Sequence, residues 1–258
     1  MKVIFAYNKM NYHYKPMNDN FVRLAKLSVN SAKKYYRTKF YGDKQSYQFF
    51  LENNILFDEY QLIDEDKIHE YYNIYSISKI YAMITETEPY IVMDFDVVLF
   101  EKLESNHSIT YGQPELIIKD TIAFKELNWV YNSYIKPFNE HIKKYYENEL
   151  EDFRWTVYPS FCVMMVNNPL FVSSSYQDIF DRIPKKTIHK ITPTLLEQLM
   201  LHQYIVKYNV DFEFFMEYNY YNIDKDFHYI KMLSKKFVHI NINDENIEKE
   251  LEYLEKNL

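Results

Sequence analysis

The chain's most informative feature is a pair of aspartates, Asp94 and Asp96, that interrupts an apolar run. Residues 90–93 suit a buried parallel strand, and the apolar run resumes at residues 97–100. On an extended backbone, residues two apart point to the same side, so the two carboxylates should share a face, with Phe95 on the other. Ionised carboxylates this close repel each other and are costly to desolvate, and a hard cation such as Mg²⁺ or Mn²⁺ would relieve both penalties.

A simpler interpretation of this pair is a solvated strand end that binds nothing, which is the commoner role of an Asp-x-Asp sequence in a loop. Here the pair follows a helix-like segment and a buried strand, and open α/β sheets place ligand sites at strand ends of this kind. The sequence therefore favours a ligand-binding role for Asp94 and Asp96.

Size and composition narrow the classes of protein. The 258 residues suffice for one large α/β domain or two small ones, and a hydrophobic content of 47% allows a sizeable core. The net charge of −7 and the lack of long Lys/Arg runs argue against nucleic acid as the main partner. The single cysteine, Cys162, lies in an apolar stretch and is expected to be a core residue in a reducing compartment.

No part of the sequence is expected to cross or be targeted to a membrane. No apolar run reaches the roughly 18 residues that a transmembrane helix needs. The first eight residues turn polar too soon for a signal peptide. We therefore expect a cytoplasmic protein.

Strand-like and helix-like segments alternate in the first hundred residues. Strands are expected at 2–8, 37–42, 58–63 and 90–93, and helices at 19–36, 44–53 and 74–87. Asn18 or Asp19 should cap the first helix, and Pro89 should end the third. This alternation is typical of a parallel sheet, and right-handed crossovers place the carboxyl ends of its strands at one edge.

The second half of the chain is less regular. Strands are expected at 108–112, 161–166 and 237–242, and helices at 123–135, 138–150, 169–181, 194–207 and 244–257. The sequence has neither an internal repeat nor a low-complexity linker. We therefore expect a single domain, residues 1–258, with an α/β half at residues 1–103 and a less regular lobe with a C-terminal helix at residues 104–258.

The chain resembles a GT-A glycosyltransferase in its α/β half, its paired carboxylates near residue 95 and the less regular half behind them. The nearest match is to the capsular-polysaccharide and glycogenin-like families. In those families a helix bearing a basic residue leads into an apolar strand that ends in Asp-x-Asp. Later come a strand containing an Asn, an acidic-Gln pair on a helix and a His on a strand near the C-terminus. The matching residues in this sequence are Lys79, Asp94, Asp96, Asn167, Glu197, Gln198 and His239.

The resemblance implies a Rossmann-like, mostly parallel GT-A sheet flanked by helices. Residues 1–103 would bind a nucleotide sugar, with UDP favoured, and residues 104–258 would bind a glycan or another hydroxyl acceptor. A Mn²⁺ or Mg²⁺ ion that bridges the donor phosphates would stabilise the charge that develops as the sugar departs. The near-C-terminal His is commoner in retaining families, so retention of configuration is favoured.

The same resemblance assigns the metal ligands. Asp96 would bind the ion directly, Asp94 would share the ion and the ribose, and His239 would supply a third ligand through its neutral imidazole. Alternation places His239 opposite Val238 and Ile240, which fits a ligand and fits equally a partly exposed strand residue.

Three further candidates each have an ordinary alternative. Lys79 would contact the donor phosphate or sugar, or would be a surface lysine of its helix. Tyr7, at the end of the first strand, would stack on the nucleotide base or belong to the core. Asn167 would contact the sugar or the acceptor, or would simply end its strand.

The acidic-Gln pair also has two interpretations. Glu197 or Gln198 would face the transferred sugar on the strength of the resemblance. However, the sequence from Thr194 to Glu197 has the form of a capping box, which would occupy Glu197 at the start of its own helix.

Two other classes of function compete with a glycosyltransferase. A metal-dependent nucleotidyltransferase or phosphatase-like hydrolase could use the same carboxylates, although residues 8–18 lack the Gly-rich loop of sugar-activating nucleotidyltransferases. A non-catalytic carbohydrate-binding or interaction protein on a transferase scaffold is the other class, and the intact Asp94/Asp96 pair argues against it. The glycines that often follow the family's acceptor-side strand are missing at residues 163–168. Their absence argues against the close approach of the backbone to the sugar that glycine allows.

Overall fold

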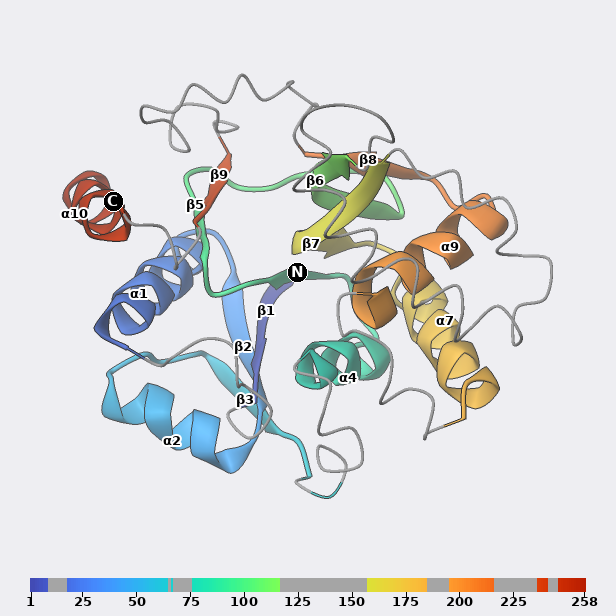
Figure 1. Ribbon diagram of the computed structural model, residues 1–258, viewed down its shortest axis with the longest axis horizontal. Coiled ribbons are helices and arrows are strands. Elements are labelled where there is room, and N and C mark those ends of the chain that lie inside the picture. Colours follow the sequence, from blue (N-terminus) through green and yellow to red (C-terminus); the bar gives the residue numbers. More distant parts are fainter. Residues whose placement is uncertain are drawn as a thin grey trace.

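A seven-stranded sheet lies between two groups of helices, with strand order β3-β2-β1-β4-β7-β6-β8 (Figure 1). The computed structural model describes residues 1–8, 18–64, 66, 76–116, 157–184, 195–215, 236–240 and 246–258. The strands of this sheet are β1 (Lys2–Tyr7), β2 (Arg37–Gly42), β3 (Glu59–Leu62), β4 (Tyr90–Met93), β6 (Ile109–Leu116), β7 (Val157–Val166) and β8 (Phe212–Phe214). The helices predicted at 123–135 and 138–150 lie outside the described residues.

Among the described strands of this sheet, β7 alone runs against its neighbours. Strands β3, β2, β1 and β4 are parallel, β7 is antiparallel to both β4 and β6, and β8 is parallel to β6. This confirms the predicted α/β class, a mostly parallel sheet flanked by helices. Strands from both halves of the chain contribute to the same sheet.

The helices begin and end near the predicted positions. They are α1 (Asp19–Lys33), α2 (Lys44–Glu52), α4 (Ile77–Thr85), α7 (Pro169–Arg182), α9 (Met200–Lys207) and α10 (Ile247–Asn257), with a π-helical turn at Leu195–Leu199 before α9. Asn18 caps α1 as predicted, because its Oδ1 accepts a hydrogen bond from the Phe21 amide at 2.9 Å. Among the described helices, none combines the length and the apolar character needed to cross a bilayer.

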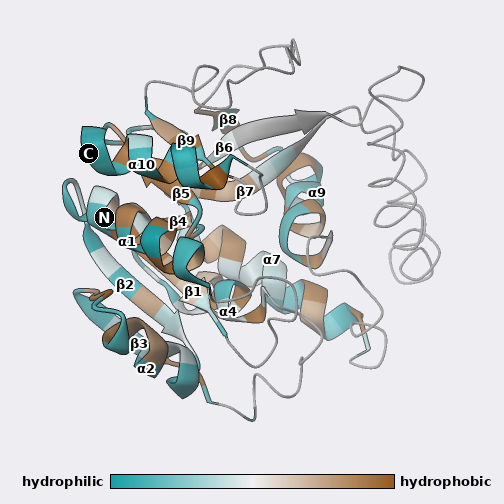
Figure 2. Cartoon of the chain, turned by 60° about the vertical axis from the view of Figure 1, so that its left-hand side comes forward, coloured by the Kyte–Doolittle hydropathy of each residue, from teal (hydrophilic) through white to brown (hydrophobic). Residues whose placement is uncertain are grey.

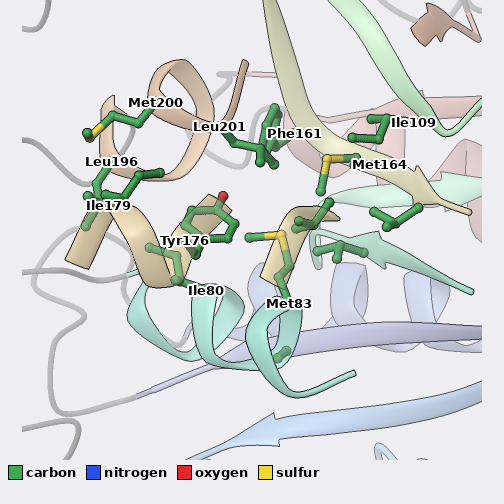
Figure 3. Packing of buried hydrophobic residues seen from close by; sticks show 14 of the residues in the cluster. Ile80, Met83, Ile109, Phe161, Met164, Tyr176, Ile179, Leu196, Met200 and Leu201 are labelled. Atoms are coloured by element: carbon green, nitrogen blue, oxygen red, sulfur yellow. The ribbon is translucent and has the colours of Figure 1, made fainter. Parts of the chain in front are cut away.

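Alternating residues of the strands build two cores, one on each face of the sheet. On β1, Ile4 packs with α4 and α7, whereas Val3 and Phe5 pack with α1 and α2. Figure 3 shows Ile80 and Met83 of α4 near Tyr176 and Ile179 of α7, below Phe161 and Met164 of β7. Each fully buried side chain of this size stabilises the fold by about 1.5–3 kcal/mol.

A small second sheet joins the end of β4 to the C-terminal part of the chain. Strand β5 (Val97–Leu99) pairs antiparallel with β9 (Phe237–His239), and Val97 lies opposite His239. The pair packs on α1 and α10, and α10 carries mainly hydrophilic residues on its outside (Figure 2). Arg23 of α1 holds α10 through ion pairs with Glu248 and Glu255, at 2.6 and 2.8 Å.

The differences from the predicted elements have local causes. The first residues of β7 lie before the predicted strand at 161–166 and include Pro159, and proline is rare in central strands. The pairing of β4 with β7 stops at Met93, which lies opposite Val163. The first residues of β7 extend beyond this point, so Pro159 pairs only with β6. Strand β8 was missed because three residues are too few to show a period.

Candidate active site

The predicted aspartate pair lies in a turn at the carboxyl end of β4. The Val97 amide donates to the Asp94 carbonyl at 3.3 Å, and the Asp94 amide donates to the Cys162 carbonyl at 2.8 Å. The expectation of an extended backbone through this pair is therefore wrong. Phe95 does point away from the site, since its ring stacks on Phe50 with 4.8 Å between ring centroids.

Two serines of α1 and one residue after β9 hold the backbone of this turn and of β5, which follows it. Ser28 donates to the Asp94 carbonyl at 3.3 Å, and Ser31 accepts from the Leu99 amide at 2.9 Å. The Ile240 amide donates to the Asp96 carbonyl at 2.7 Å. These two serines were not among the predicted site residues, although serines beside the apolar face of a helix are visible in its sequence.

Lys79, in the first turn of α4, is the centre of a buried ion-pair group. Its Nζ lies 2.8 Å from Asp94 Oδ1, 2.6 Å from Glu197 Oε1 and 2.8 Å from the Phe161 carbonyl oxygen. Burial lowers the pKa of Lys79, but Asp94 and Glu197 raise it by more, so the ammonium stays charged. The alternative of a surface lysine is wrong, because Lys79 is 7% exposed. Its contact with the donor phosphate or sugar stays a prediction.

Glu197 belongs to the π-helical turn before α9 and is 3% exposed. Burial raises the pKa of Glu197, the nearby Asp94 raises it further, and Lys79 opposes both effects. Short π-helical turns are often found at functional sites. The carboxylate of Glu197 faces Lys79 of another helix, and the capping box proposed for it cannot be followed because Thr194 lies outside the described residues. Within the described part of the chain, the buried Oε1 of Gln198 has no hydrogen-bond partner.

Asp96 faces His239, with 3.4 Å between Oδ1 and Nε2. The Asp96 side chain is nearly buried, and that of His239 is partly exposed. Burial lowers the pKa of His239, but Cys162 and Asp96 raise it by more, and the net shift is well above the usual range. The Asp96 carboxylate therefore favours the charged form of the imidazole over the neutral form.

The side chains of Asp96 and His239 suit a divalent ion as part of its ligand set. A carboxylate and an imidazole are ligands that Mn²⁺ accepts, and Mg²⁺ sites often use one or two carboxylates plus substrate phosphates. Among the described residues, no group of three or more His, Cys, Asp and Glu side chains is arranged to hold a metal ion. Asp96 and His239 fit as two ligands of an ion that phosphate and water would complete, and Asp94 keeps one oxygen on Lys79.

Asn167 lies at the opposite edge of the sheet from the aspartates, which corrects its predicted contact with the sugar or acceptor. Because β7 is antiparallel to β4, its Val166 pairs with Tyr90 at the start of β4. Asn167 is thus roughly 16 Å along the strand from Cys162. Its Nδ2 donates to the carbonyls of Ser105 and His107, at 3.0 and 2.7 Å, so it ends its strand.

Tyr7 belongs to the core, the second of its two predicted roles. Its side chain is 3% exposed, and its ring contacts those of Phe21, Phe50 and Phe95, with centroids 5.5 to 6.0 Å apart. This packing leaves no open ring face on which a nucleotide base could stack.

The structure thus joins Lys79, Asp94 and Glu197 in one group and Asp96 and His239 in a second, at the two ends of one turn. A further polar residue lies at this edge and was missed by sequence analysis. Asn8 follows β1 directly, is fully buried, and donates from Nδ2 to Ser78 Oγ of α4 at 3.1 Å. A polar residue at the carboxyl end of a parallel strand was the signal for it.

No protein-family model and no curated protein sequence matches the chain. Among solved structures, the crystal structure of apo mouse xyloside xylosyltransferase 1 is similar over 81% of this chain and 76% of that chain. The two are 13% identical, with a TM-score of 0.33.

Proposed function

We propose that this chain is a metal-dependent glycosyltransferase that moves a sugar from a nucleotide-diphosphate sugar, with UDP favoured, to a glycan or another hydroxyl acceptor. One observation carries the proposal. The turn after β4 presents two carboxylates at the carboxyl edge of a parallel sheet, one held by a buried lysine and the other facing a histidine. Open α/β sheets bind their ligands at this edge.

The charges at this edge favour a donor that arrives with a cation. Asp94, Asp96 and Glu197 supply three carboxylates, and the ammonium of Lys79 is already shared between two of them. A diphosphate placed here would meet net negative charge unless a divalent ion offset it. Once bound, Mn²⁺ or Mg²⁺ would neutralise the charge that develops on the departing diphosphate.

The residues of the chain have separate roles in this proposal. Asp96 and His239 would hold the ion, and His239 would bind it through its neutral imidazole. Asp94 would share the ion and the ribose through the oxygen that does not face Lys79. Phe95, in the aromatic core, fixes the turn between the two aspartates.

Retention of configuration fits the same arrangement. An inverting transferase uses a carboxylate as general base to activate the acceptor. In the described part of the site, Glu197 is paired with Lys79, and Asp94 and Asp96 are assigned to the donor and its ion. We therefore infer that transfer proceeds without one of these carboxylates as the base.

The proposal is tested by product analysis with purified protein. Nucleotide sugars of UDP, GDP and CMP are incubated with Mn²⁺ or with EDTA, and released nucleotide and free or transferred sugar are quantified. Mn²⁺-dependent release of a nucleoside diphosphate together with the sugar supports a glycosyltransferase. Formation of a nucleotide sugar from a nucleoside triphosphate and a sugar phosphate would instead identify a nucleotidyltransferase. No turnover of any donor, with or without an acceptor glycan, would favour a non-catalytic role.

A further inference from the structure

We propose that Lys79 is a positioning residue that orients Asp94 toward the ion, and that Glu197 is the buried counter-charge that makes this possible. The inference rests on the proposed function, because it concerns the same metal site. It differs from the roles that sequence analysis gave to Lys79 and Glu197, a donor contact and a sugar contact.

The geometry fixes Lys79 from three directions. Its partners come from the turn after β4, from β7 and from the π-helical turn before α9, at 2.8, 2.8 and 2.6 Å from Nζ. Two of these contacts are hydrogen bonds, to Asp94 and to the Phe161 carbonyl, and the third is an ion pair with Glu197, so the three close partners together hold the ammonium in place. Asp94 Oδ1 is held at one corner of this arrangement, so the orientation of its carboxylate is set.

The two carboxylates on Lys79 are in different surroundings. The Asp94 side chain is 40% exposed, whereas that of Glu197 is 4% exposed. A buried ammonium needs a counter-charge, and Glu197 supplies it from inside the protein. Together the three groups carry one net negative charge, so Asp94 can share its charge with a cation without leaving Lys79 unpaired.

The chain contains a matched pair away from the site. Lys39 Nζ lies 2.8 Å from Glu86 Oε1, and the two side chains are 15% and 6% exposed. Glu86 follows the last residue of α4, at the other end of the helix that begins near Lys79. Removing the Lys39 ammonium takes one of two lysines from a similarly buried carboxylate, which keeps Lys2 at 3.3 Å, and it does not disturb Asp94.

The test measures Mn²⁺ affinity in the presence of UDP, by electron paramagnetic resonance of free Mn²⁺, together with the melting temperature. Lys79→Met should lower the melting temperature and weaken Mn²⁺ binding at least tenfold, as loss of a residue that orients a metal ligand usually does. Lys79→Met/Glu197→Gln should regain much of the melting temperature, because no buried charge is stranded, while Mn²⁺ binding stays at least tenfold weaker. Lys39→Met should lower the melting temperature and leave Mn²⁺ binding unchanged.

Two results would overturn the positioning role alone. The first is unchanged Mn²⁺ affinity in Lys79→Met. The second is recovery of both stability and Mn²⁺ affinity in the double variant, which would mean that Lys79 only neutralises Glu197. If Lys79→Met does not fold, the double variant decides. Failure of the wild-type protein to bind Mn²⁺ with any nucleotide would overturn the proposed function and this inference together.

Discussion

His239 Nε2 lies 3.4 Å from Asp96 Oδ1, and this contact links a turn in the first half of the chain to a strand close to its C-terminal end. The link is made by the two-stranded sheet, in which His239 lies opposite Val97. It brings an imidazole to the second of the two aspartates, while Lys79 holds the first. The proposed metal site depends on these two contacts.

Asp96→Asn should reduce turnover of the sugar donor at least 100-fold and leave the melting temperature close to that of the wild type. The substitution keeps the shape of the side chain but removes a charge where transition-state charge is stabilised. Asp211→Asn is the control, because Asp211 binds Ser108 near Asn167, at the opposite edge of the sheet. Turnover above about a tenth of the wild-type rate would remove Asp96 from the site, since deletions of this kind usually cost 100-fold or more.

His239→Ala should raise the Mn²⁺ concentration needed for half-maximal turnover at least tenfold, with a smaller effect on folding. The reason is that the imidazole faces Asp96 and can serve as a ligand once it has lost its proton. His107→Ala is the matched control, because His107 also faces two carboxylates, Asp211 and Glu213, each at 3.4 Å. An unchanged Mn²⁺ requirement in His239→Ala would make this residue an ordinary member of its strand.

Asn167→Ala should lower the free energy of unfolding by about 1–2 kcal/mol without changing turnover. The side chain donates two hydrogen bonds to carbonyl groups of Ser105 and His107, and it lies away from the aspartates. Denaturant unfolding and donor turnover are compared in the same preparations. A loss of turnover that exceeds the loss of folded protein would return Asn167 to the site.

His202 should make the protein less stable in acid. Burial lowers the pKa of His202 to about 4, below the unfolded value near 6.5. The neutral, buried imidazole therefore contributes its full stability above the pKa of the unfolded chain. As the pH falls to the pKa in the folded protein, about 3 kcal/mol of the free energy of unfolding is lost. His202→Gln does not titrate, so unfolding between pH 7 and pH 4 should show a smaller loss of stability than in the wild type. Equal losses in the two proteins would contradict this role.

The order of strands and helices in the first hundred residues agrees with the prediction, because the periodicity of apolar residues governs both the secondary structure and the buried face there. Strands β2 and β4 have the predicted bounds, and α1 begins after the predicted cap, Asn18. Agreement is best where an apolar strand is packed on both faces.

The site was predicted in its residue types more than in its geometry. Asn167 was misplaced because periodicity gives the length of a strand but not its direction, and β7 is antiparallel to β4. The pairing of Lys79 with Glu197 joins helices far apart in the sequence, and no local pattern records such a contact. The sequence predicts an extended backbone through Asp94 and Asp96 because apolar runs flank the pair, and apolar runs do not show a turn between two strands.

The most direct test of the central claim is thermal unfolding of the wild-type protein with UDP, GDP or CMP, each with and without Mn²⁺. The account predicts that one nucleotide, UDP by preference, raises the melting temperature only when Mn²⁺ is present. Ligand at about 100 times its dissociation constant adds roughly 2.7 kcal/mol to the free energy of unfolding, which such a measurement resolves. Asp96→Asn should lose this shift. No shift with any combination, or an equal shift in EDTA, would contradict a metal-dependent nucleotide site.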